Sequence, residues 1–184
     1  MKRKVALFAT SIFCILSLIS CRRYASESAS VATVGDSKIL VSDFKANFKK
    51  LHPSAQVKYV SLEGRRKFLS LLIQEKIRNL AATKAGYQVS SSNEDLMTIS
   101  RSTTSASYQY ATQVLIKLFS VEEQETFQYF KKNAARYKGG QNYSTARQQI
   151  EDYLIEEKVK HWFAEQKKIF PIEINQNVLN SIKL

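Results

Sequence analysis

Residues 31–43 read VATVGDSKILVSD. Two short apolar runs, 31–34 and 38–41, flank Gly35-Asp36-Ser37, and this pattern predicts a β-hairpin. Gly35 and Asp36 tolerate the positive φ angles of a tight turn, so the two runs can fold back on each other. An isolated hairpin is at best marginally stable, so we expect it to need a further strand.

The alternating segment Phe170-Pro171-Ile172-Glu173-Ile174 supplies a candidate for that strand. Proline lacks a backbone N–H, so Pro171 places the segment at a sheet edge or a strand start. We therefore expect the N-terminal hairpin and this C-terminal strand to form one small sheet.

Helical patterning dominates the rest of the chain. Apolar residues recur at three- and four-residue steps from Ser61 to about Ala85, which predicts a long helix that Gly86 ends. Shorter helices are expected at about 42–51, which His52-Pro53 ends, and at 93–99, 108–119 and 120–137, with a second long helix over 144–168. Ser42, Ser120 and Ser144 are the predicted N-terminal caps.

The predicted fold class is therefore mostly α with a small β-sheet. The core is expected to include Leu72, Ile73 and Ile77, which share one helical stripe, and Trp162, which continues the apolar face of the last long helix.

A secretion signal precedes this domain. Lys2, Arg3 and Lys4 are followed by an uncharged apolar run from Val5 to Ile19, which is too short for a confident transmembrane span. The sequence Leu18-Ile19-Ser20-Cys21 resembles the lipobox of bacterial lipoproteins, which implies cleavage before Cys21 and lipid attachment to it. An ordinary cleaved signal or an uncleaved short anchor would give a similar pattern.

The expected organisation is a signal peptide at 1–20, a flexible Ser-containing tether at 21–30 and one domain at 31–184. Cys14 lies within the signal, so Cys21 would be the only cysteine of the mature chain. We therefore expect no disulfide and no thiolate chemistry. We expect the mature protein to be exported and lipid-anchored to a bacterial membrane, facing the periplasm or the outside.

The chain is strongly basic, with 28 Lys and Arg against 16 Asp and Glu. Only three of these charges, all basic, lie within residues 1–20. Such charge favours binding to anionic lipid headgroups or to acidic unfolded polypeptides. The charged side chains could also simply lie on solvent-exposed helix faces. An exported lipoprotein rarely meets nucleic acid, so we expect no nucleic-acid partner.

Catalytic patterns are weak. No glycine-rich phosphate loop is present, and the only histidines, His52 and His161, have no supporting carboxylate pattern for zinc. The adjacent carboxylates Glu122-Glu123 and Glu156-Glu157 point to different faces of their helices. We therefore expect no enzyme activity, cofactor or metal.

Several short motifs occur in a characteristic order along the chain. They are Val31, Ala32, Val34, Gly35, Ile39, Ser42, Asp43 and Phe44, then residues 72–77, 81–82, 84–86 and 89–90, then residues 120–123 and 129–133, and finally Trp162 through Ile172-Glu173-Ile174. In their order and spacing, these motifs resemble the SurA/PrsA family of exported foldases.

The resemblance implies a SurA N-terminal-like chaperone module that holds unfolded exported or outer-membrane proteins. Family members carry a parvulin prolyl-isomerase domain after the helix equivalent to residues 120–137, whereas only Lys138 to Tyr143 occupy that gap here. We therefore expect no isomerase activity. A chaperone must keep apolar surface available, and the candidate client-binding residues are Tyr108, Tyr110, Phe127, Tyr129, Tyr137 and Tyr143.

A second class of function fits the same residues. A structural lipoprotein could use this fold to grip one folded envelope partner, and the residues alone do not separate the two classes. The sequence also leaves open the clients, the membrane and the oligomeric state.

Overall fold

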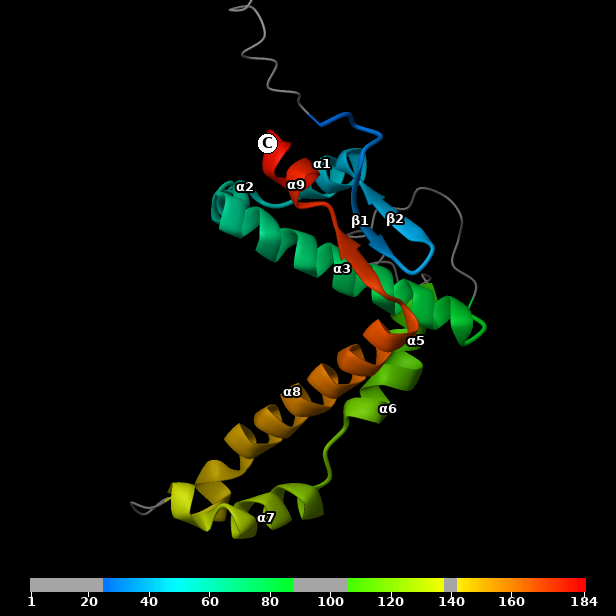
Figure 1. Cartoon of the computed structure of the whole chain (residues 1–184). Coiled ribbons are helices and arrows are strands. Elements are labelled where there is room, and N and C mark those ends of the chain that lie inside the picture. Colours follow the sequence, from blue (N-terminus) through cyan, green and yellow to red (C-terminus); the bar gives the residue numbers. More distant parts are fainter. Residues whose placement is uncertain (1–24, 88–105, 138–141) are drawn as a thin grey trace, which may run out of the picture.

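The computed structural model describes residues 25–87, 106–137 and 142–184 (Figure 1). This part of the chain is mostly helical and contains a small three-stranded antiparallel sheet, which confirms the predicted fold class. The predicted helix at 93–99 and Cys21, the predicted site of lipidation, lie outside the described residues.

The sheet joins the two ends of the domain. Its strands are β1 (Ser30–Val34), β2 (Ser37–Leu40) and β3 (Ile172–Ile174), in the order β2-β1-β3 with both pairs antiparallel. Gly35 adopts a φ of +55° in the hairpin turn, and its N–H donates to the carbonyl of Pro171 at 2.9 Å. The expected pairing of the hairpin with the C-terminal strand is therefore confirmed.

Four helical segments follow the hairpin, and the first begins directly after β2. They are α1 (Val41–Lys49), α2 (Pro53–Gln56), the 3₁₀ turn η1 (Val57–Tyr59) and α3 (Leu62–Lys84). The Ser61 hydroxyl caps α3 by accepting from the Gly64 N–H at 3.0 Å, and Gly86 ends it with a φ of +88°.

The second half of the chain contains α5 (Ala106–Tyr110), a π-helical turn (Ala111–Leu115) and α6 (Ile116–Phe119), which follow one another directly. After these come α7 (Glu123–Lys132), the 3₁₀ turn η3 (Ala134–Tyr137), α8 (Tyr143–Ile169) and α9 (Gln176–Ser181). Within the described ranges, no helix combines the length and the apolar character that a membrane crossing needs.

The three predicted serine caps, Ser42, Ser120 and Ser144, are wrong. At α1, the Asp43 carboxylate accepts from the Leu40 N–H at 2.9 Å, so the helix begins at Val41. At α7, Glu125 accepts from the Glu122 N–H at 3.1 Å, and at α8 the side-chain oxygen of Asn142 accepts from the Thr145 N–H at 3.0 Å. The helices begin at Val41, Glu123 and Tyr143, so Leu40, Glu122 and Asn142 occupy the N-cap positions instead of the three serines.

The domain begins before Val31. Ser30 belongs to β1, the carbonyls of Ala29 and Glu27 accept from the first N–H groups of α1, and Glu27 pairs with Lys45 at 2.6 Å. The predicted tether of residues 21–30 therefore includes a segment held on the domain, and residues 21–24 lie outside the described part.

The core lies between the sheet, α1, α3 and α9. Phe68 on α3 contacts Phe44 edge-to-face, with ring centroids 5.0 Å apart. Leu72, Ile73, Ile77 and Trp162 are all buried, as the sequence predicts. Buried Leu179 brings α9 into the same core.

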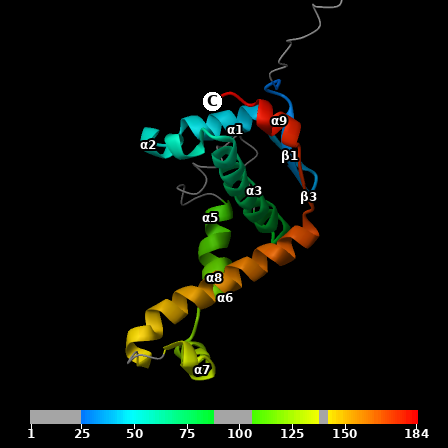
Figure 2. The same ribbon diagram turned by 60° about the vertical axis from the view of Figure 1, so that its left-hand side comes forward.

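The remaining helices extend away from this core. Figures 1 and 2 show α7 at the opposite end of the molecule from α1, α9 and the start of the described chain, with α8 running from the α7 end to the start of β3. Lys158 ties α7 to α8 by contacting the Ser120 carbonyl at 2.7 Å and the Glu125 carboxylate at 3.0 Å. The ammonium group lowers the pKa of that carboxyl.

Candidate binding groove

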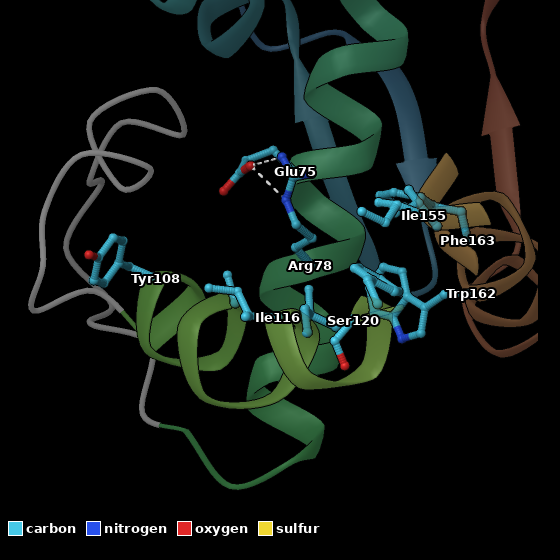
Figure 3. Close-up of a pocket in the computed structure, with 12 residues that line it drawn as sticks. Glu75, Arg78, Tyr108, Ile116, Ser120, Ile155, Trp162 and Phe163 are labelled. Atoms are coloured by element: carbon cyan, nitrogen blue, oxygen red, sulfur yellow. Dashed lines mark hydrogen bonds and ion pairs between the residues drawn. The ribbon is translucent and has the colours of Figure 1, made fainter. Parts of the chain in front are cut away.

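A groove of about 650 Å³ opens where α3, the segment 106–120 and α8 meet (Figure 3). Most of the side chains around it are apolar. Its lining residues are Glu75, Arg78, Tyr108, Ala111, Leu115, Ile116, Phe119, Ser120, Ile155, Val159, Trp162 and Phe163.

One wall of the groove is a stripe on α8. Ile155, Val159, Trp162 and Phe163 follow at the three- and four-residue steps that place side chains on one helix face. Trp162 is only 8% exposed, and its ring meets Phe119 edge-to-face at 6.0 Å and Phe163 at 4.9 Å. This aromatic contact links the α8 wall to the facing helix.

The facing wall comes from the π-helical turn and α6. Leu115 is buried there, whereas Ile116 is 62% exposed. Leu118, two residues further along, is 51% exposed but is not among the lining residues. The groove is therefore open to solvent at the Ile116 side.

The third wall carries an ion pair. Arg78 donates through Nε to the Glu75 carboxylate at 3.1 Å and makes a second contact through its terminal nitrogen, both drawn as dashed lines in Figure 3. Glu75 is buried and Arg78 is half-buried. The two opposite charges offset each other, so this wall adds polar groups without adding net charge.

The structure separates the six predicted client-binding residues. Tyr108 lines the groove. Tyr110 is buried beside it, with its ring edge-to-face to Tyr87 at 5.6 Å. Burial raises the pKa of the Tyr110 hydroxyl, and a hydrogen bond with Trp162 offsets only part of this effect. Tyr110 therefore acts as core and offers little surface to a ligand.

The other four lie at the far end of the molecule, where α7, η3 and α8 meet. Phe127 contacts Tyr143 edge-to-face at 5.2 Å, and Tyr129 lies 5.2 Å from Tyr153. The Tyr137 ring lies tilted against that of Phe130, with centroids 5.2 Å apart, and burial raises the pKa of the Tyr137 hydroxyl. These rings mainly hold α7 and η3 on α8, so the six residues do not form one surface.

A hydrogen-bonded pair anchors the same junction. The hydroxyls of buried Thr126 and of Tyr143 lie 2.6 Å apart, and Thr126 also donates to the Glu123 carbonyl at 2.7 Å. Tyr143 therefore has a structural partner within the domain.

Sequence reasoning missed most of the groove. Ile116, Phe119, Ile155, Val159 and Phe163 were not among the predicted site residues, because an apolar stripe on a helix usually indicates core. The length of α8 could have indicated the groove. Its apolar stripe continues beyond the part of the helix that packs against the core formed by the sheet, α1, α3 and α9.

Other chemistry is sparse in the described part of the chain. His52 accepts from the Ser54 N–H at the start of α2, and His161 is exposed. In residues 25–87, 106–137 and 142–184, no three His, Cys, Asp or Glu side chains gather closely enough to hold a metal ion.

Comparison with protein families, with curated proteins and with solved structures finds no match to this chain. The groove and the fold therefore carry the functional argument.

Proposed function

We propose that this protein is a lipid-anchored, SurA N-terminal-like chaperone that holds unfolded exported polypeptides and lacks prolyl-isomerase activity. The observation that carries the proposal is the open, mainly apolar groove between α3, α6 and α8. Exposed apolar surface of this kind usually serves binding in a soluble domain.

The groove favours an extended polypeptide over a small polar ligand. Its walls present aliphatic and aromatic side chains, which suit the varied apolar residues of unfolded chains. The Glu75–Arg78 pair adds hydrogen-bonding groups that could meet a peptide backbone without selecting for its charge.

Suppression of aggregation tests the proposal. A soluble form that lacks Cys21, residues 22–184, is mixed at stoichiometric ratios with several unrelated denatured exported proteins, and light scattering is followed. Ile116→Ser should weaken suppression, because Ile116 lines the groove. Leu118→Ser is the matched control, because Leu118 is also exposed and lies in the same helix but outside the groove lining.

Trp162 gives a direct readout of the same site. It is the only tryptophan of the chain and lines the groove, so an apolar peptide bound there should change its emission. Ile116→Ser should shift this titration to higher peptide concentration, and Leu118→Ser should not.

Two outcomes would count against the proposal. Acceleration of proline-limited refolding, an uncatalysed step of tens to hundreds of seconds, would contradict the absence of isomerase activity. If the protein suppresses aggregation of none of the several unrelated clients, the alternative of a lipoprotein that binds one folded partner is favoured.

A further inference from the structure

We propose that the segment Val57–Val60, together with the lysines beside it, docks on an anionic lipid surface next to the lipid anchor. This inference rests on the proposed lipidation of Cys21. The lipid would tether the chain, and the docking surface would fix how the domain stands on the bilayer. We call residues 57–60 the membrane tip.

The membrane tip displays apolar side chains to solvent. Val57 is 75% exposed, the most exposed large apolar side chain of the described residues, and Val60 is 57% exposed. The segment is held firmly, because Gly64 on α3 approaches the backbone of Lys58 and Tyr59, and the Tyr59 ring packs against Phe68 at 5.3 Å. Two aliphatic side chains are thus presented on a fixed backbone.

Lysines accompany these valines. Lys58 lies between them in sequence. Lys49 is the last residue of α1 and Lys50 is its C-cap, just before α2 leads into the tip. Long lysine side chains can reach phosphate groups while neighbouring apolar groups enter the acyl boundary. This combination of aliphatic and cationic side chains matches the headgroup region of an anionic bilayer.

Among the described residues, the excess of positive over negative charge lies mainly in the half of the chain that contains the tip. Residues 25–87 contain eleven Lys and Arg against five Asp and Glu, whereas residues 106–137 and 142–184 together contain ten against nine. Attraction to an anionic surface falls off within a Debye length, so the half that carries the excess would face the lipid.

The tether length also places this end at the membrane. Cys21 precedes Ala25, the first described residue, by four residues, which span at most about 14 Å when extended. Figures 1 and 2 show the start of the described chain, α1 and α2 at one end of the molecule and α7 at the other. A lipid on Cys21 would therefore keep the tip near the bilayer and direct α7 away from it.

Vesicle sedimentation tests the inference without the lipid anchor. The described packing lies within residues 25–87, 106–137 and 142–184, so a soluble form that lacks Cys21, residues 22–184, is used. It should sediment with vesicles that contain phosphatidylglycerol and much less with vesicles of phosphatidylcholine alone. Added salt should weaken the binding.

Matched variants separate the tip from diffuse charge. Lys49→Gln with Lys50→Gln should weaken binding about fivefold for each lysine. The control, Lys131→Gln with Lys132→Gln, removes an equal charge from the C-terminal end of α7 and should change binding little. Val57→Ser with Val60→Ser should also weaken binding severalfold, whereas Ile116→Ser with Leu118→Ser should not.

Equal losses from both lysine pairs, or no loss from the valine changes, would overturn the inference. The groove experiments separate its failure from that of the proposed function. Variants of the tip should still suppress aggregation, and Ile116→Ser should still bind vesicles.

Discussion

Gly64 lies so close to Tyr59 that a Cβ atom on Gly64 would be 2.6 Å from the Tyr59 Cα and 2.4 Å from the Lys58 carbonyl oxygen. The first turn of α3 and the 3₁₀ turn before it therefore pack backbone to backbone. Only a residue without a side chain fits at this position.

Gly64→Ala should destabilise the protein although alanine is the better helix former by about 1 kcal/mol. The added methyl group meets backbone atoms, and overpacking of this kind costs roughly 1–3 kcal/mol. Gly86→Ala is the comparison, since its Cβ would meet nothing within 4 Å and only the φ of +88° is strained. Thermal unfolding should show the larger loss for Gly64→Ala, and equal melting temperatures would contradict the close packing.

Arg78→Met should destabilise by about 2 kcal/mol, because it leaves the buried Glu75 carboxylate without its partner. The half-buried position of Arg78 keeps the loss below that of a fully buried pair. Glu75→Gln added to Arg78→Met should recover much of the stability in urea unfolding. A double variant less stable than Arg78→Met alone would refute this explanation.

Leu179→Ala should cost roughly 2–5 kcal/mol, because Leu179 is fully buried where α9 meets the core. Leu184→Ala, at an exposed position, should cost little. Truncation after Lys168 should lower the melting temperature further, since it removes β3 and α9 together. It also removes the carbonyls of Leu179 and Ile182 to which Arg65 donates. An unchanged melting curve for the truncated chain would disprove the support that the C-terminal strand gives to the hairpin.

Stability should fall at alkaline pH, partly because of Tyr110. Burial raises the pKa of its hydroxyl in the folded protein. The stability contributed by neutral Tyr110 is therefore fully present below the unfolded-state pKa of about 10, and it is lost as pH rises through the folded-state pKa. Tyr110→Phe should reduce this loss in melting temperatures measured from neutral pH upward. Identical pH profiles for the two proteins would exclude Tyr110 as a cause.

Cys21→Ser should abolish labelling of the protein by a radioactive fatty acid and allow its release from membranes in a high-salt wash. The control is Cys14→Ser, which changes the cysteine inside the apolar signal and should keep the label. Labelled Cys21→Ser protein, or its retention on membranes after the wash, would refute lipidation at this position.

The small sheet could be predicted because its signals are local. The Gly35-Asp36 turn fixes the hairpin, and the alternation at 172–174 identifies the third strand. The apolar stripe of α3 was likewise enough to predict that its residues are buried, because a long helix with one apolar face normally packs that face against the core. Helix starts were harder to predict, since polar side chains that can bond end N–H groups lie close together in the sequence, and Asp43, Glu125 and Asn142 make these bonds instead of the nearby serines.

The groove could not be predicted because it depends on how helices meet. Ile155 and Val159 have the same periodicity as core residues, and only the position of α8 relative to α6 leaves them at an opening. Tyr129 and Tyr143 suggested a binding surface by their aromatic character, but the rings and hydroxyls of α7 and α8 use each other as partners. Residue type alone does not tell these two roles apart.

α8 contains 27 residues and neither glycine nor proline, so it forms an uninterrupted rod of about 40 Å. Trp162 holds one part of this rod in the core, while Tyr143 lies at its far end under α7. Because such a rod is stiff, a tilt of roughly ten degrees about Trp162 would carry Tyr143 through about 5 Å. The same tilt would move Ile155 much less, because Ile155 lies closer to Trp162 along the helix. A large displacement of α7 would therefore change the groove width only slightly.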